Sequence, residues 1–182
     1  MVQPKAPSNP GRRKFLINAT SVVGAGAVAG AVVPFIGSWN PSAKAEAAGA
    51  PARADLSKLL PGEMMIVEWR GVPVYVVKHT QESMSVLNKN LSRLSDPDSL
   101  EDQQPDYARN ELRSRKKGIS VLTAVCTHLS CAPKFYPELG TTDFDTDWQG
   151  GFFCPCHGSK FDLVGRVYAG VPAPTNLPIP PH

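Results

Sequence analysis

The longest uncharged run of the chain lies close to its N-terminus. Residues 15–37, FLINATSVVGAGAVAGAVVPFIG, contain no acidic or basic side chain. At 1.5 Å per residue, a helix of that length crosses a hydrocarbon core of about 30 Å. We therefore predict a transmembrane anchor helix over residues 15–37, which Pro34 would end or kink near its far end.

The pattern changes after this run. Residues 38–58 are rich in Ala, Pro and Gly with scattered charges, which is typical of a flexible linker. A short surface helix over Ala43–Ala48 is the alternative, and the segment could be extended in one state and coiled in another. We expect a hinge over 38–58 and a globular domain over 59–182.

The globular part has the pattern of an antiparallel β domain. Met64–Trp69 and Val72–Lys78 alternate or run apolar on either side of Arg70-Gly71, which predicts a hairpin. Two further strands would each lead directly into a cysteine, and another would follow the last cysteine. These three segments are Ile119–Val125, Gly150–Phe153 and Lys160–Tyr168.

One helical stripe interrupts the strands. Met84, Leu87, Leu91 and Leu94 recur at helical spacing. We expect one amphipathic helix within residues 80–112, with this stripe in the core, followed by a loop rich in Pro and Asp.

Charge is concentrated at the N-terminus. Four of the 19 basic residues and none of the 16 acidic residues lie within residues 1–14. The rest of the chain is close to neutral, so a nucleic-acid-binding face is not expected. The later basic cluster is expected to be a solvated surface. It consists of Arg113, Arg115, Lys116 and Lys117.

The basic N-terminus also suggests how the chain is oriented. Arg12-Arg13 directly precedes the apolar run and resembles a twin-arginine export signal, a route that carries folded proteins. Basic residues on this side of a membrane helix favour the cytoplasm. We expect residues 1–14 to be cytoplasmic, in a bacterial inner-membrane protein whose C-terminal domain lies in the periplasm.

The candidate chemistry lies in two short clusters, Cys126-Thr-His128-Leu-Ser-Cys131 and Cys154-Pro-Cys156-His157-Gly-Ser159. All four cysteines lie in these two clusters, and each cluster also has one histidine. This arrangement indicates a metal site rather than disulfides spread through a small fold. Two Cys and two His could bind zinc, or the cysteines could form two disulfides. A [2Fe–2S] centre held by two Cys and two His is the third option, and it alone gives all six residues a role.

The two clusters resemble the cluster-binding boxes of the Rieske iron–sulfur proteins of cytochrome bc1 complexes. The resemblance rests on CTHLSC and CPCHGSKFD, and extends over Val121–Pro133, Gly150–Leu177, the anchor and the Ala-rich neck. Rieske ferredoxins and ring-hydroxylating dioxygenases lack the second cysteine pair. The resemblance implies one [2Fe–2S] cluster. Its ligands would be Cys126 and Cys154 on one iron and His128 and His157 on the other, with a disulfide between Cys131 and Cys156.

The resemblance also implies roles for the residues around the cluster. His157 would hydrogen-bond quinol and accept its proton, with His128 as the second exposed proton carrier. Ser159 would bond a bridging sulfide, and Leu129 would pack over the cluster and dock on cytochrome b. The run Gly170–Leu177 is similar to the family's proline loop, which covers the cluster from a third side.

The implied fold is mostly β. It is a Rieske-type antiparallel β domain with a small cluster-binding part at about 121–177, plus one N-terminal transmembrane helix. The implied function is electron transfer in a quinol:cytochrome c oxidoreductase, from quinol at the outer quinone site to cytochrome c1. Cytochromes b and c1 would be its partners, within a homodimeric complex. Although Ala43-Lys44-Ala45 has the form of a cleavage site, the resemblance favours a retained anchor.

Two other functions are compatible with the motifs. An exported Rieske subunit of another oxidase, such as arsenite oxidase, would carry the same boxes. A zinc-stabilised periplasmic binding module would use the same four donors without redox chemistry. Co-purification with cytochromes b and c1 would separate the first from the bc1 type, and a colourless protein with one zinc would indicate the second.

The sequence departs from the family in three places. Ser130 stands where many members have Gly, a change that we expect the loop to tolerate. Phe161 replaces a frequent Tyr whose hydroxyl donates to a ligand sulfur, which predicts a somewhat lower reduction potential. The sequence stops at His182, where the family usually continues into a final strand, so we expect a truncated chain or a base sheet that closes differently.

A few remaining polar residues are assigned no role in the site. His79 and His182 are expected to be ordinary core or surface residues. Asp143, Asp145 and Asp147 could suggest a cation loop, but we interpret them as a solvated turn.

Overall fold

The computed structural model describes residues 9–182, and predictions for residues 1–8, including the first part of the basic segment, lie outside that range. The chain divides between Ala47 and Ala48 into two compact units. The first contains a long helix and the second contains the β domain, and each is described by itself.

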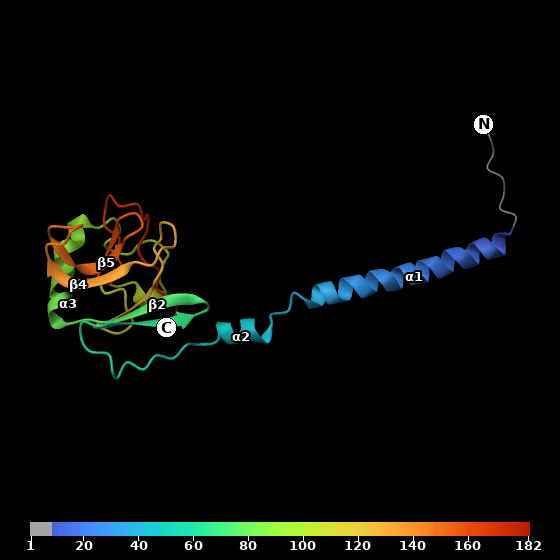
Figure 1. Ribbon diagram of the computed structural model, residues 1–182, viewed down its shortest axis with the longest axis horizontal. Helices are drawn as coiled ribbons and strands as arrows, with labels where there is room; N and C mark the ends of the chain where they lie inside the picture. The colour runs from blue at the N-terminus through green and yellow to red at the C-terminus, as the bar shows by residue number, and fades with distance from the viewer. Residues whose placement is uncertain (1–8) are drawn as a thin grey trace, which may run out of the picture. The chain divides into compact units, whose positions relative to one another are not determined.

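The helix expected as the anchor is α1, Pro10–Gly37 (Figure 1). It begins five residues earlier than expected, because the Asn9 side chain accepts a hydrogen bond from the Arg12 amide (3.1 Å) and Pro10 has the fixed φ of a first helical residue. Pro34 does not end the helix, which continues to Gly37, where the Ser38 amide donates to the Pro34 carbonyl (2.9 Å). By length and composition α1 is able to cross a membrane.

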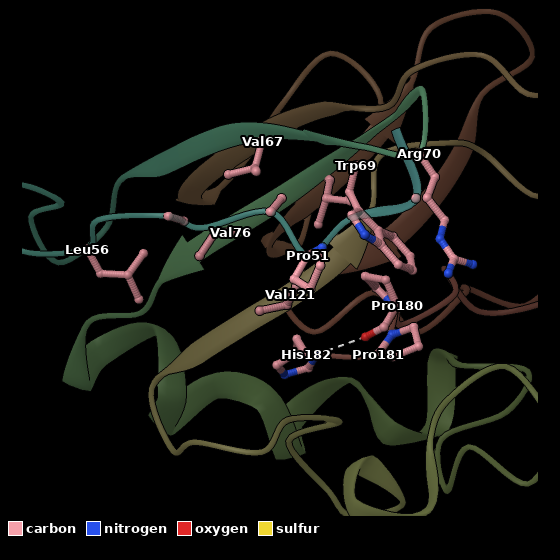
Figure 2. A pocket seen from close by; sticks show the side chains of 14 residues that line it. Pro51, Leu56, Val67, Trp69, Arg70, Val76, Val121, Pro180, Pro181 and His182 are labelled. Atoms are coloured by element: carbon pink, nitrogen blue, oxygen red, sulfur yellow. Dashed lines mark hydrogen bonds between the residues drawn. The ribbon is translucent and has the colours of Figure 1, made fainter. Parts of the chain in front are cut away.

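The predicted linker contains the helical alternative. Helix α2, Ala43–Gly49, is exposed along its whole length. Residues 50–56 then run extended across the outer face of the first sheet of the β domain. Figure 2 shows this crossing, with Pro51 and Leu56 lying over Val76 and Val121. The groove there measures about 560 Å³ and its lining is mostly apolar.

The first sheet is antiparallel, in the order β1-β2-β3. Its strands are β1 (Met64–Trp69), β2 (Val72–Lys78) and β3 (Ile119–Thr123). The predicted β1–β2 hairpin is confirmed, and its two turn residues, Arg70 and Gly71, both have positive φ (54° and 73°). Such a turn twists in the same sense as the strands that it joins.

The second sheet has the order β4-β5-β6 and holds the second cysteine cluster. Its strands are β4 (Lys134–Gly140), β5 (Trp148–Cys154) and β6 (Ser159–Asp162). Strand β4 was not predicted, because Pro137 and a register shift between Tyr136 and Leu139 interrupt its alternation. Gly151 is required in β5, since a Cβ there would lie 2.1 Å from the Phe161 carbonyl oxygen.

The main core lies between the two sheets, which Figure 1 shows as separate layers. Tyr75 from β2 stacks on Phe152 from β5, with ring centroids 5.4 Å apart and planes 3° from parallel. The Tyr75 hydroxyl donates to the Pro133 carbonyl (2.6 Å), just after the first cysteine cluster. Packing of the sheets therefore also positions the loops at their ends.

The prediction of one amphipathic helix within 80–112 was wrong. Helix α3 (Gln81–Val86) is followed by two short 3₁₀ helices, η1 (Leu87–Arg93) and η2 (Asp106–Ala108). A 3₁₀ helix repeats every three residues, so the helical spacing of the stripe no longer holds after Leu87. Leu91 is consequently 40% exposed, while Leu94 is extended and bridges to Tyr168.

Candidate metal centre

The two cysteine clusters are loops that follow strands of different sheets. The first begins three residues after β3 and closes on itself. The Cys126 amide donates to the Cys131 carbonyl (2.7 Å), and the Ser130 amide donates to the Cys126 carbonyl (3.0 Å). Ser130 has φ +64°, a conformation that costs a side-chain-bearing residue about 1 kcal/mol and that Gly adopts freely.

The second cluster is the tight turn between β5 and β6. Cys154 and Ser159 are opposite each other in the ladder, and the Gly158 amide donates to the Cys154 carbonyl (2.9 Å). This turn leaves Cys156 and His157 exposed at its tip, while Cys154 and Ser159 are buried below them.

A disulfide joins the two loops. It connects Cys131 to Cys156, the pair that the resemblance implied, with Cα atoms 6.6 Å apart. The other two cysteines, Cys126 and Cys154, are free thiols, each 2% exposed. The sulfur atoms of Cys131, Cys154 and Cys156 lie within 4.8 Å of one another, but only Cys154 among them retains a thiol that could bind a metal.

The histidines of the two clusters lie against each other. The rings of His128 and His157 have centroids 4.8 Å apart and lie nearly perpendicular, at 87°. The Nδ1 atom of His128 is buried and has no hydrogen-bond partner among residues 9–182. A buried imidazole nitrogen without a partner is costly in a native fold, unless it binds a metal.

The buried thiols lead to the same interpretation. Burial raises the pKa of Cys126, although a hydrogen bond from the His128 amide opposes that effect, and the adjacent Cys154 thiol raises it further. Two thiols in contact cannot both ionise without a cation between them. Two thiols and two imidazoles at one place therefore fit the two-Cys, two-His donor set of a Rieske [2Fe–2S] cluster.

The proline loop, residues 170–177, connects the two clusters. The Ala173 amide donates to Ser159 Oγ (3.0 Å), and Thr127 Oγ1 donates to the Thr175 carbonyl (2.8 Å). Ser159 is fully buried, and because its oxygen accepts from Ala173, its own hydroxyl proton stays free for another acceptor. Sequence reasoning missed Thr127, since a hydroxyl between two ligands has no pattern of its own.

Two other predicted positions differ sharply in exposure. Leu129, between His128 and Cys131 in the first loop, is 65% exposed. Phe161 is fully buried in the core between the sheets. Its ring therefore occupies the interior without supplying a hydroxyl.

The prediction that Arg113 belongs to a solvated basic surface was wrong. Its side chain is fully buried and donates to the carbonyls of Val164 (3.0 Å) and Leu177 (2.8 Å) and to Gln104 Oε1 (3.1 Å). Burial lowers the pKa of Arg113 to about 10. The guanidinium thereby fixes the C-terminal end of the proline loop, a role that its charged neighbours in sequence conceal.

The solvated turn predicted at three aspartates holds for Asp143 and Asp147 but not for Asp145. Asp145 is buried and forms ion pairs with Arg93 (2.5 Å) and Lys160 (2.8 Å). Burial would raise the pKa of Asp145, but hydrogen bonds from the two cations lower it to about 2. Because this carboxylate already binds two cationic side chains, it is not available as a ligand of a cation-binding loop.

The two histidines outside the clusters are ordinary, as expected. His79 is buried, and its Nε2 atom lies 2.8 Å from Ser120 Oγ. Burial lowers the pKa of His79 to about 4. His182 is exposed, and its amide donates to the Tyr107 hydroxyl (2.8 Å).

The chain is similar in sequence to known proteins. A family model for the "Ubiquitinol-cytochrome C reductase Fe-S subunit TAT signal" matches residues 3–42, and the "Rieske [2Fe-2S] domain" model matches residues 101–181. The ubiquinol-cytochrome c reductase iron-sulfur subunit of Allochromatium vinosum is 54% identical over 96% of this chain and 84% of its own length. The same subunit of Blastochloris viridis is 44% identical over 94% of this chain and 86% of its own length. A chain of a solved hyperthermophilic respiratory Complex III is 26% identical, with a TM-score of 0.49 over 92% of both chains.

Proposed function

Because the chain belongs to the family of ubiquinol–cytochrome c reductase iron–sulfur subunits, we propose that it transfers electrons within a cytochrome bc1 complex. The observation that carries the proposal is the meeting of two buried thiols and two imidazoles, one with an orphaned nitrogen, at the disulfide between two loops. We propose Cys126, Cys154, His128 and His157 as the ligands of one [2Fe–2S] cluster.

The cluster, when bound, supplies one-electron transfer at high potential, because neutral imidazoles replace two thiolates. His157 is exposed at the tip of its loop, where it is able to accept a hydrogen bond and a proton from quinol. His128 is half-buried beside it and is the second candidate proton carrier. Ser159 keeps its hydroxyl proton for a sulfur acceptor, and the proline loop limits the access of water to the site.

The exposed Leu129 supports a docking role for the tip of the first loop. It is 65% exposed between two structurally constrained residues, His128 and Cys131. We propose that it enters an apolar surface on cytochrome b, and that the reduced domain then reaches cytochrome c1. The segment 38–58 would act as the hinge for that movement, within a homodimeric complex.

The proposed location is the bacterial inner membrane. The match to an export-signal family and the apolar helix α1 support a retained single anchor with the β domain in the periplasm. Labelling of an introduced cysteine in the β domain of intact cells with a membrane-impermeant thiol reagent tests this orientation. Protection of the domain in intact cells, with labelling only after lysis, would contradict it.

The central experiment is electron paramagnetic resonance of the detergent-solubilised full chain. We expect a rhombic [2Fe–2S] signal after ascorbate, since the histidine ligands favour reduction. A signal that requires dithionite would indicate a low-potential ferredoxin role. A colourless protein with one bound zinc and no signal would refute the iron–sulfur assignment.

A matched pair of leucines separates docking from cluster binding. Leu129→Asp and Leu100→Asp alter two exposed leucines, 65% and 78% exposed, of which only Leu129 lies beside the proposed cluster. We expect both variants to keep the resonance signal. Quinol:cytochrome c reductase activity of the assembled complex should fall at least tenfold with Leu129→Asp alone. Equal activities would contradict the docking role.

A further inference from the structure

The proline loop is held at its base by a segment distant in sequence from both cysteine clusters. Residues 93–99 begin at the last residue of η1, about 30 residues before the first cluster. The Ala169 amide donates to the Arg93 carbonyl (2.8 Å), and the Ser95 amide donates to the Val167 carbonyl (3.0 Å). These two bonds fix the chain just before the proline loop begins.

The far end of the loop is fixed to the same segment by one side chain. Asn176 Nδ2 donates to the Asp96 carbonyl (3.0 Å), to Asp96 Oδ2 (3.3 Å) and to Ser99 Oγ (3.2 Å). Its Oδ1 accepts from the Val167 amide (2.8 Å). Asn176 is fully buried, and its amide orientation follows from its neighbours, because the nitrogen faces acceptors and the oxygen faces a donor.

Asn176 therefore joins both ends of the proline loop. Through Val167 it contacts the entry of the loop, and through Asp96 and Ser99 it contacts residues 93–99. The residue before it, Thr175, accepts the hydrogen bond from Thr127 in the first cluster. A displacement of Asn176 thus moves one of the two points at which the loop touches the cysteine clusters.

We infer that Asn176 is a positioning residue, which holds the proline loop against both cysteine clusters through its bonds to residues 93–99. The inference rests on the proposed function, because the loop is argued to cover the cluster. The second contact point of the loop is the bond from the Ala173 amide to Ser159 Oγ. When that amide is held in place, the Ser159 hydroxyl proton points away from the loop, toward the buried cysteine sulfurs, which would accept it.

The structure favours this role over plain core packing. A packing residue would be served by an apolar side chain, whereas Asn176 uses its oxygen and both of its amide protons on partners from two segments. Arg113 still holds the end of the loop at Leu177, so loss of the Asn176 hydrogen bonds loosens the loop ahead of that point, and with it the Ala173 contact. The Ser159 hydroxyl is then able to turn toward the loosened loop, which weakens its donation to sulfur and lowers the reduction potential.

The test compares Asn176→Asp with Asn90→Asp in the detergent-solubilised full chain. Asn176→Asp replaces the donor with a carboxylate that faces Asp96, and Asn90 is a matched control, 2% exposed, with no hydrogen-bond partner for its Oδ1 among the described residues. Hydrogen exchange of the Ala173 amide, followed by mass spectrometry, should accelerate at least tenfold with Asn176→Asp relative to the control. The reduced-to-oxidised ratio at a fixed ambient potential should fall about threefold.

A second variant covers the case in which Asn176→Asp does not fold. Asn176→Ser keeps a small polar group without adding a charge, and it should change both readouts in the same direction by a smaller factor. Unchanged Ala173 exchange and unchanged potential, with only a lower unfolding midpoint, would overturn the inference and leave Asn176 a structural residue. A wild-type chain that binds no cluster would instead refute the proposed function, while the exchange measurement would still decide whether Asn176 holds the loop.

Discussion

The buried ion pair next to the second cysteine cluster offers a stringent test of how this fold is held together. Arg166 Nε donates to Asp162 Oδ2 (2.7 Å), and the two side chains are 2% and 1% exposed. Asp162 Oδ1 also accepts from the amides of Val164 (3.1 Å) and Arg166 (2.7 Å). The arginine reaches out of the turn and donates to the Leu87 carbonyl (3.1 Å).

The informative change is Asp162→Asn, which keeps the shape of the side chain and removes its charge. The Asn oxygen is still able to serve the turn amides, but its NH₂ group then faces the Arg166 guanidinium, donor against donor. Removing one partner of a buried pair leaves an uncompensated charge and costs about 3–5 kcal/mol. For a chain of this size that corresponds to a fall in Tm of about 10 °C.

The control is an exposed pair of the same composition. Arg109 Nη2 lies 2.7 Å from Asp102 Oδ1, and the Asp102 side chain is 91% exposed. Asp102→Asn should cost no more than about 1 kcal/mol. Urea unfolding of the full chain in detergent, followed by tryptophan fluorescence to which the buried Trp148 contributes, measures both variants. A cost for Asp162→Asn similar to that of Asp102→Asn would show that the buried pair is not required by the fold.

Three further outcomes are expected. The pKa of His79 is about 4 in the folded chain and about 6.5 in the unfolded chain. The unfolded state therefore binds more protons between these two pH values, and the free energy of unfolding falls by about 3 kcal/mol as the pH is lowered through them. His79→Gln should flatten this pH dependence of urea unfolding, and parallel curves would contradict it. Replacing both Cys131 and Cys156 with Ser opens a loop spanning 25 residues and should cost about 3.5 kcal/mol by loop closure, measured in the same way. Phe161→Tyr should raise the reduction potential in a redox titration, and an unchanged value would show that the added hydroxyl does not reach a ligand sulfur.

The sequence carries the parts of this structure that depend on local patterns. The β1–β2 hairpin is encoded by Arg70-Gly71 between two apolar runs, and helix α1 by an uncharged run long enough to span a membrane. The disulfide could be expected only through the family resemblance, because four cysteines allow several pairings. Spacing alone does not distinguish between them.

Two of the errors share a physical cause, which is tertiary contact between distant segments, and the third is a local change of helix type. Arg113 lies among exposed basic residues in sequence, yet its guanidinium is in the interior and donates to the carbonyls of Val164 and Leu177. Asp145 looks like part of an acidic turn until Arg93, 52 residues earlier, pairs with it. The Met and Leu stripe followed helical spacing, but the chain switches to a 3₁₀ helix after Val86, which leaves Leu91 40% exposed while Leu94 is still buried.

The division of the proposed ligands between two sheets has a consequence for how long the protein retains its cofactor. Cys126 and His128 follow β3 of one sheet, whereas Cys154 and His157 belong to the β5–β6 turn of the other. Any fluctuation that parts the sheets separates the ligand pairs, and the Tyr75–Phe152 stack is one of the contacts that resist it. The rate at which the protein loses iron therefore reports how often the sheets separate. A conservative substitution deep in the core shortens the time for which the protein keeps its cofactor, while its fold at equilibrium stays intact.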